Sequence, residues 1–175
     1  ANGDQPFITA VNGEGDCRYI LYEFLEGEEV DPDKDAEIIG ALLGSFHSLM
    51  KEYTGPLTQR DRQFYIGRYI DIMRRKNYPR INAFEKYGNR LWNRLKDLPR
   101  SYSHGDMYSG NIQKTADGKL YILDFDTSCE GFRLYDAALI CNRTDFFDLS
   151  NDGLYRSKDV FERFVPAYRG YNELT

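Results

Sequence analysis

Three oxygen-bearing side chains flank a predicted β-hairpin late in the chain. Asp106 and Asn111 lie at either end of a short loop, and Asp124 follows thirteen positions later, directly after the apolar run 121–123. Because a hairpin brings the start of its first strand beside the end of its second, Asn111 and Asp124 should meet at its open end, with the Asp106 loop beside them. Carboxylate and amide oxygens suit Mg²⁺, and a further carboxylate can take or orient the proton of an attacking hydroxyl. The pattern therefore predicts phosphoryl-transfer chemistry.

The elements around this hairpin predict an α+β fold. Residues 16–25 mix β-branched, aromatic and leucine side chains, as a buried strand does. Apolar residues at steps of three and four predict helices over 35–53, 60–76 and 80–96, a helix beginning near Asp136 and one over 157–169. Strands at 111–114 and 119–125 are joined by Asp117-Gly118, which is a strong hairpin signal. This order of elements favours α+β over a doubly wound parallel sheet.

The composition predicts a globular protein with no nucleic-acid or membrane partner. Hydrophobic residues make up 41% of the 175 residues, charged residues make up 29%, and the net charge is −5. An acidic chain fits poorly against a phosphate backbone, and the basic run 74–76 is better explained as a solvated helix face. No stretch approaches the ~18 apolar residues of a membrane span, and the first residues lack the pattern of a signal peptide. Cys17, Cys129 and Cys141 are too widely spaced for a zinc site and fit reduced thiols, so we expect a cytoplasmic location.

The same spacing of Asp, Asn and Asp occurs in protein kinases, where a base, a metal-binding amide and a metal-binding acid follow one another around a hairpin. Here His-Gly-Asp at 104–106 and Asp-Phe-Asp at 124–126 replace the protein-kinase versions of these motifs. In this respect the chain resembles the aminoglycoside phosphotransferase and choline kinase superfamily of small-molecule kinases. Three flanking segments resemble that superfamily in the same order: YILYEFLEG at 19–27, LLGSFHSLM at 42–50 and YDAALI at 135–140.

The resemblance covers most of residues 17–142 and implies a protein-kinase-like fold, mainly its helical C-terminal lobe with a catalytic β-hairpin. It implies that Asp106 is the catalytic base, and that Asn111 and Asp124 hold Mg²⁺ with the phosphates of ATP. Asp126 stands where the superfamily commonly has glycine. For Asp126 a role in the metal shell, or as ligand of a second metal, is as plausible as none.

The resemblance also implies residues that bind the nucleotide base and residues that support the catalytic loop. The backbone of Glu23 and Leu25 would meet the adenine, with Tyr22 at the gatekeeper position. Asp136 would brace the catalytic loop without reacting, and His104 would be packed against the loop without acting as a base. These five assignments come from the family pattern and from no spacing argument of their own.

The resemblance has one clear gap, in the N-terminal lobe. Relatives carry there a phosphate-covering loop and a strand lysine, but the first lysine of this chain is Lys34, beyond the predicted hinge. We therefore expect residues 1–26 to be the last strand of the N-terminal lobe with the hinge, and residues 27–175 to be the C-terminal catalytic lobe, truncated at its end. On this reading the N-terminal lobe is mostly absent, its remainder would be a partner within a parent protein, and the chain alone would be inactive.

The expected function is transfer of the γ-phosphate of ATP to a hydroxyl of a small metabolite, such as choline, ethanolamine, homoserine, a sugar-like alcohol or an aminoglycoside. Four acids after the metal motif either line a cationic-substrate pocket or form a solvated surface: Glu130, Asp145, Asp148 and Asp152. The alternative is a non-catalytic kinase-fold nucleotide-binding module. A metal-dependent phosphoesterase fits less well, because it needs several histidines. This chain has two, and His47 lies on the apolar stripe of a predicted helix, as a hydrogen-bonded core histidine would.

Overall fold

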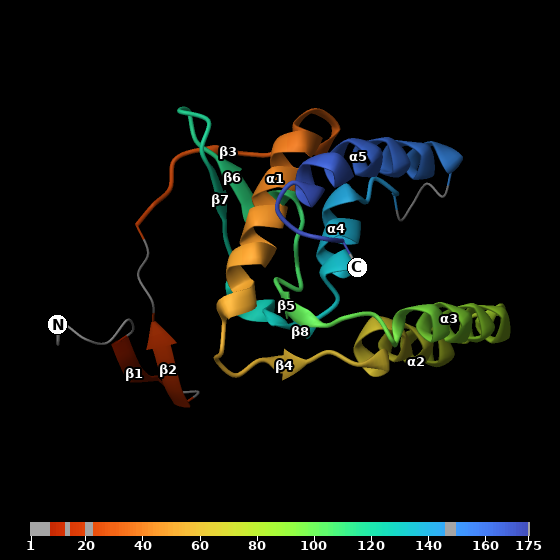
Figure 1. Cartoon of the computed structure of the whole chain (residues 1–175). Coiled ribbons are helices and arrows are strands. Elements are labelled where there is room, and N and C mark those ends of the chain that lie inside the picture. The colour runs from red at the N-terminus through yellow and green to blue at the C-terminus, as the bar shows by residue number, and fades with distance from the viewer. Residues whose placement is uncertain (1–7, 13–14, 20–22, 146–149, 175) are drawn as a thin grey trace.

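The computed structural model describes residues 8–12, 15–19, 23–145 and 150–174. The strands form three small sheets (Figure 1): β1 (Ile8–Asn12) with β2 (Gly15–Tyr19); β3 (Glu28–Glu29), β6 (Ile112–Lys114) and β7 (Leu120–Ile122); and β4 (Thr58–Gln59), β8 (Cys129–Gly131) and β5 (Ser101–Ser103). The helices are α1 (Pro32–Leu49), α2 (Arg68–Arg75), α3 (Ile81–Leu95), α4 (Arg133–Cys141) and α5 (Asn151–Arg169). This is the α+β arrangement that the sequence predicts. Across the described ranges, every helix is too short or too polar to serve as a membrane-spanning segment.

The predicted hairpin is present as β6 and β7, which pair antiparallel with Ile112 opposite Ile122. At the closed end, Thr115 N donates to Lys119 O at 2.9 Å, and Gly118 takes the positive φ of 81° that such a turn needs. The strand β3 joins the outer edge of β6. The hairpin is therefore anchored in a sheet of its own, and its open end points toward the residues predicted to do chemistry.

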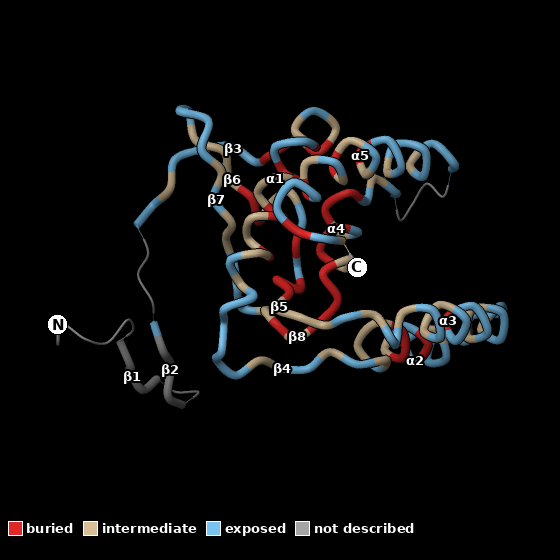
Figure 2. The backbone as a smooth tube through the Cα atoms, in the orientation of Figure 1, coloured by how far each residue is buried: buried red, intermediate tan, exposed pale blue. Residues whose placement is uncertain are grey.

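The core lies where α1, α4 and α5 pack against one another and against the loop before β6 (Figure 2). Its largest fully buried side chains include Ile39, Leu43 and Phe164. On α1, Gly44 faces the backbone of α5 so closely that a Cβ atom there would lie 2.6 Å from the carbonyl oxygen of Tyr168. Glycine at this position is what allows the two long helices to approach.

A buried polar network crosses this core. His47 of α1 is 2% exposed. Its Nδ1 lies 2.8 Å from the hydroxyl of Tyr168 on α5, and its Nε2 lies 3.1 Å from Oδ2 of Asp136 on α4. The prediction of a hydrogen-bonded core histidine is thus confirmed, and the network ties three helices together through side chains far apart in sequence.

The helices α2 and α3 lie side by side beyond β4 and β8, away from this core (Figure 1). A π-helical turn, Gln63–Gly67, leads into α2. Most of the surface of this pair is exposed (Figure 2), although Ile66 and Ile70 are buried between the two helices and beside Gly88. Tyr69 and Tyr87 of this pair are 43% and 58% exposed.

The structure corrects several predicted boundaries. Of the strand predicted over 16–25, residues 16–19 belong to β2, residues 20–22 lie outside the described residues, and residues 23–25 belong to no strand. Asn111 lies in a short 3₁₀ turn ahead of β6, and β7 ends before Asp124 because that residue has a left-handed backbone. The apolar face of α1 becomes exposed to solvent at the C-terminal end of the helix, where Leu49 is 69% exposed. The two-residue strands β3 and β4 are too short to produce a periodic signal.

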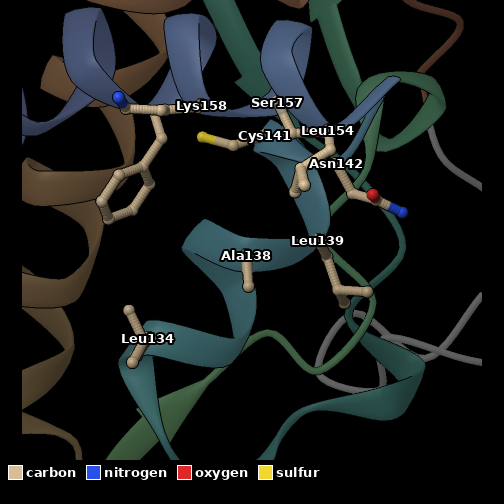
Figure 3. A pocket seen from close by; sticks show the side chains of 9 residues that line it. Leu134, Ala138, Leu139, Cys141, Asn142, Leu154, Ser157 and Lys158 are labelled. Atoms are coloured by element: carbon tan, nitrogen blue, oxygen red, sulfur yellow. The ribbon is translucent and has the colours of Figure 1, made fainter. Parts of the chain in front are cut away.

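A cavity of about 600 Å³ lies between α4 and α5 (Figure 3). Leu134 and Ala138 point into it from α4, and Leu154 points into it from the start of α5. Its lining is mainly apolar and includes none of the residues that the sequence assigned to catalysis or nucleotide binding. The chemistry predicted for the chain therefore belongs elsewhere.

The close contact at Gly44 predicts that Gly44→Ala destabilises the fold. Overpacking against a backbone carbonyl costs about 1–3 kcal/mol, and the better helix propensity of alanine offsets only about 1 kcal/mol of this. Urea unfolding should therefore show a lower free energy of unfolding. Gly170→Ala is the matched control, because Gly170 has a helical φ of −61° and its nearest contact would be 3.2 Å away. Equal stability of the two variants would contradict the packing argument.

Tyr168 predicts a loss of stability at alkaline pH. Burial, as the largest cause, raises the pKa of Tyr168 from 10.0 to about 12, while Arg133 lowers it and the Asp136 carboxylate raises it. Because the folded pKa lies above the unfolded one, the stabilisation is fully present below pH 10 and is lost as the pH rises toward 12.

We expect Tyr168→Phe to cost about 1–3 kcal/mol at pH 7, because His47 Nδ1 loses its donor, and to remove part of the decline between pH 10 and 12. Urea unfolding at pH 7 measures the first effect, and urea unfolding between pH 10 and 12 measures the second. Tyr171→Phe serves as the control, since Tyr171 is 55% exposed. A decline with unchanged slope in Tyr168→Phe would show that this hydroxyl does not titrate as described.

Candidate functional site

The loop after β5 carries Asp106 and is shaped by a glycine. Gly105 has a φ of 83°, a left-handed value that glycine adopts without strain. A Cβ atom at this position would lie 2.5 Å from the carbonyl oxygen of Thr127. The hydroxyl of Thr127 also donates to the carbonyl oxygen of His104 at 3.0 Å. The loop is therefore packed directly against the segment that follows β7.

Asp136 holds this loop from the other side. Its side chain is fully buried in the first turns of α4. Its carboxylate accepts hydrogen bonds from the backbone N–H groups of His104 and Gly105, at 2.7 and 2.9 Å, and from the hydroxyl of Ser103 at 2.8 Å. With the contact to His47, both oxygens are satisfied in the way that a buried charge requires. These contacts support the bracing role expected for Asp136.

His104 is also fully buried, and both of its ring nitrogens are in hydrogen bonds. Nε2 lies 2.8 Å from the carbonyl oxygen of Leu123 and must donate to it, while Nδ1 accepts from the backbone N–H of Asp106 at 3.4 Å. The pattern fits a neutral imidazole protonated on Nε2. No ring nitrogen is left to act as a base, which supports the packing role expected for His104.

Asp106 and Asn111 are in contact, as the sequence predicts. Asn111 Nδ2 donates to the carbonyl oxygen of Asp106 at 2.8 Å and approaches its Oδ2 at 3.5 Å. The carbonyl oxygen of Asn111 accepts from Leu123 N at 2.9 Å. Since Leu123 also bonds His104, four backbone and side-chain links bring the loop, the start of β6 and the end of β7 to one place. The side chain of Asp106 is exposed there, whereas Asn111 is buried.

Asp124 follows immediately at this end of the hairpin. Its φ of 59° and ψ of 71° are left-handed, which is uncommon outside glycine but tolerated by Asp and Asn. This conformation ends β7 and turns the chain into the short 3₁₀ segment Phe125–Thr127, which contains Asp126. Both carboxylates are exposed and accept no hydrogen bond from the described residues.

A cleft of about 820 Å³ opens beside these acids. One wall is formed by Glu23, Phe24 and Leu25, and the other by residues 121–126. Glu23 and Leu25, which the resemblance assigned to adenine contact, and Asp124 and Asp126, which it assigned to metal binding, therefore line one cavity, although about 100 positions separate them. Asn111 does not line this cavity. Tyr22, the predicted gatekeeper, lies outside the described residues.

The oxygens at this site are of the kind that hold a hard cation. Because Nδ2 of Asn111 is used by Asp106, its Oδ1 remains as an acceptor, and Asp124 and Asp126 carry exposed carboxylates. The described ranges contain no group of three or more His, Cys, Asp and Glu side chains close enough to form a metal site from these alone. The residues thus fit Mg²⁺, which takes few protein ligands and keeps water or phosphate oxygens, and do not fit a zinc-type cage.

Sequence reasoning missed residues that act across long distances. Ser103, Thr127 and Tyr168 each bond a member of the loop network, yet none has a local signal. Tyr135 is adjacent to Asp136 and packs against the π-helical turn that precedes α2, where its ring centre lies 5.1 Å from that of Tyr65 at an angle of 75°. Only the fold brings these side chains to the loop.

Solved structures similar to this chain include an ethanolamine kinase and a choline kinase. The ethanolamine kinase of Plasmodium vivax matches with a TM-score of 0.60 and 18% identity, over 98% of this chain and 55% of its own. The choline kinase LicA of Streptococcus pneumoniae matches with a TM-score of 0.62 and 18% identity, over 93% of this chain and 55% of its own. A further structure of LicA, in complex with AMP, matches with a TM-score of 0.58. The protein-kinase-like fold implied by the motifs is confirmed.

Two relatives match at the level of sequence. An uncharacterized protein of Deinococcus radiodurans is 25% identical over 175 residues, which cover 93% of this chain and 49% of its own length. The homoserine kinase of Zymomonas mobilis is 25% identical over 146 residues, which cover 75% of this chain and 43% of its own length. The chain thus spans about half the length of these relatives. The model of the phosphotransferase enzyme family matches residues 6–173, so the chain belongs to that family.

Proposed function

We propose that this chain carries the catalytic residues of an ATP- and Mg²⁺-dependent phosphotransferase that acts on a hydroxyl of a small metabolite. The observation that carries the proposal is the shared cleft, which has the hinge residues Glu23 and Leu25 on one wall and Asp124 on the other. A nucleotide in this cleft would place its base at the hinge and its phosphates at the open end of the hairpin. The AMP complex of LicA, a structure of the same fold, supports nucleotide binding here.

The metal would be held by oxygens at the hairpin end. Asn111 would supply Oδ1 and Asp124 a carboxylate oxygen, with Asp126 as candidate ligand for a second metal. When bound, Mg²⁺ would neutralise charge on the phosphate oxygens. The chain itself contributes the fixed position of these groups, since Asn111 is tied to Asp106 and Leu123 on either side.

Asp106 would act as the base. As the acceptor oxygen attacks the terminal phosphorus, the acceptor proton passes to the Asp106 carboxylate, the bond from that phosphorus to the β-phosphate oxygen breaks, and ADP leaves. Asp106 is suited to this because its side chain is exposed while its backbone N–H is held by His104. The acceptors named by the similar proteins are ethanolamine, choline and homoserine, which share a primary hydroxyl and a nitrogen cation.

Asp106→Asn should lower phosphate transfer by about 10²–10⁴-fold and leave ATP binding unchanged, because the amide cannot accept the proton. The measurement is ADP release by the complete gene product with a panel of small alcohols, alongside nucleotide titration. Asp97→Asn is the control, an exposed acid before β5 that touches none of the loop contacts described above. Transfer within a few-fold of wild type would remove Asp106 from the role of base.

Asp124→Asn should lower ATP affinity in the presence of Mg²⁺ on the order of 10-fold or more, and leave affinity in EDTA unchanged. Asparagine is chosen because it tolerates the left-handed backbone of Asp124. Asp117→Asn, at the closed end of the hairpin, is the control. Asp126→Asn in the same titration tests the second ligand. If Mg²⁺ dependence survives in Asp124→Asn, the metal assignment is wrong.

A further inference from the structure

The helical pair beside the loop is basic, although the chain is acidic. Residues 60–100, which contain α2 and α3, have twelve Lys and Arg against four Asp and Glu, a net charge of +8 in a chain of net charge −5. Within the described residues, Arg74 alone of these twelve forms an ion pair, with Asp71 and Glu85. The positive charge on this side of the molecule is therefore mostly uncompensated.

Arg68 is the basic residue of this segment best placed to bind a ligand. It follows the π-helical turn at the start of α2, and such turns are frequent at functional sites. Its guanidinium lies 4.0 Å from the ring centre of Phe64 and 4.8 Å from that of Tyr69, and Nη2 donates to the Tyr69 hydroxyl at 2.9 Å. Its Nε is buried and has no hydrogen-bond partner among the described residues. Aromatic rings thus hold the guanidinium, which also forms a side-chain hydrogen bond with Tyr135.

Tyr135 connects Arg68 to the loop that carries Asp106. Its ring packs against those of Phe64 and Tyr65, 6.1 and 5.1 Å away between centres. The next residue, Asp136, bonds the backbone of Gly105, which directly precedes Asp106. Burial first, and then Tyr69, raises the pKa of Tyr135, Arg68 lowers it through its charge and a side-chain hydrogen bond, and the Asp106 carboxylate raises it. The Tyr135 hydroxyl is therefore a hydrogen-bond partner of Arg68.

We propose that Arg68 and Tyr135 form a subsite for a carboxylate of the acceptor, which is a small hydroxylated acid whose hydroxyl reaches Asp106. This inference rests on the proposed phosphotransferase function and narrows its substrate class. A planar guanidinium can direct two parallel N–H groups at the two oxygens of a carboxylate. The Tyr135 hydroxyl adds a further donor, and the basic surface of α2 and α3 draws an anion toward the site.

Of the acids suggested above as the lining of a cationic-substrate pocket, those that the structure describes do not cluster beside Arg68 and Tyr135. Asp145 and Asp152 flank the connection from α4 to α5, at the opposite end of α4 from Tyr135. Nine residues of helix separate the two ends by about 13 Å. Glu130 is bonded to Gln59 at 2.9 Å, and Asp148 lies outside the described residues. Arg68, by contrast, is hydrogen-bonded to Tyr135.

The test compares acceptors that differ only by the carboxylate. The pairs are L-serine with ethanolamine, L-homoserine with 3-aminopropan-1-ol, and glycerate with ethylene glycol. ADP release by the complete gene product gives kcat and KM for each. We expect at least one acid to exceed its stripped analogue by roughly 10- to 100-fold in kcat/KM, the range of a hydrogen-bonded charge pair.

The variants assign that preference to Arg68. Arg68→Gln should abolish the preference by raising KM for the acid, and Arg68→Lys should keep a part of it, because charge remains without the planar fork. Arg75→Gln, in the last turn of α2, is the matched control and should keep the wild-type ratio. Melting temperatures of the variants show whether each is folded. If Arg68→Gln does not fold, the ratio of kcat/KM between acid and stripped analogue in the wild type still tests the proposal.

The outcomes distinguish failure of the acid subsite from failure of the proposed phosphotransferase function. Transfer to the amino alcohols or glycol with no gain from the carboxylate overturns the acid subsite and leaves the phosphotransferase function standing. A preference that survives in Arg68→Gln also overturns the subsite. If ADP is released with none of these acceptors and with no other alcohol of a wider panel, the proposed function and the subsite fall together.

Discussion

The carboxylate of Asp136 is the group on which the candidate site depends most. It is fully buried and binds two consecutive backbone N–H groups of the loop, a serine of β5 and a histidine of α1. A buried charge is tolerated only while its hydrogen bonds are made, so movement of the loop would leave that charge unsatisfied. Asp136 thereby fixes the backbone that presents Asp106. The contact from Tyr168 through His47 extends this constraint to the last turns of α5.

The residues around the loop divide the site into two sides. On one side, the hairpin end and the hinge segment enclose a cleft with free carboxylates, which is suited to a cation and a nucleotide. On the other, α2 and the start of α4 present aromatic rings and the guanidinium of Arg68. Asp106 contacts Asn111, and its carboxylate raises the pKa of the Tyr135 hydroxyl. Under the proposed function, the nucleotide would bind on the first side and the acceptor on the second.

The sequence predicted those features that depend on neighbours along the chain. Asp117-Gly118 determined the hairpin, and the hairpin in turn determined that Asn111 and Asp124 lie at one end. The family resemblance supplied the cleft wall at Glu23 and Leu25, which no periodicity would have shown. Contacts between distant segments could not be predicted, because they depend on how whole helices pack. The hydrogen bond between His47 and Asp136 spans 89 positions. The pairing of β4 with β8 consists of two residue pairs, which is too short to leave a pattern in the sequence.

We propose that Asn111 and Asp124 share one cation beside the cleft that is lined by Glu23 and Leu25. The most direct measurement is a crystal structure of the complete gene product with Mn²⁺ and a non-hydrolysable ATP analogue, with the metal located by its anomalous signal. We expect an anomalous Mn²⁺ peak within bonding distance of Asn111 Oδ1 and an Asp124 carboxylate oxygen, with the adenine against Glu23 and Leu25. A peak away from both residues, or a nucleotide outside this cleft, would contradict it.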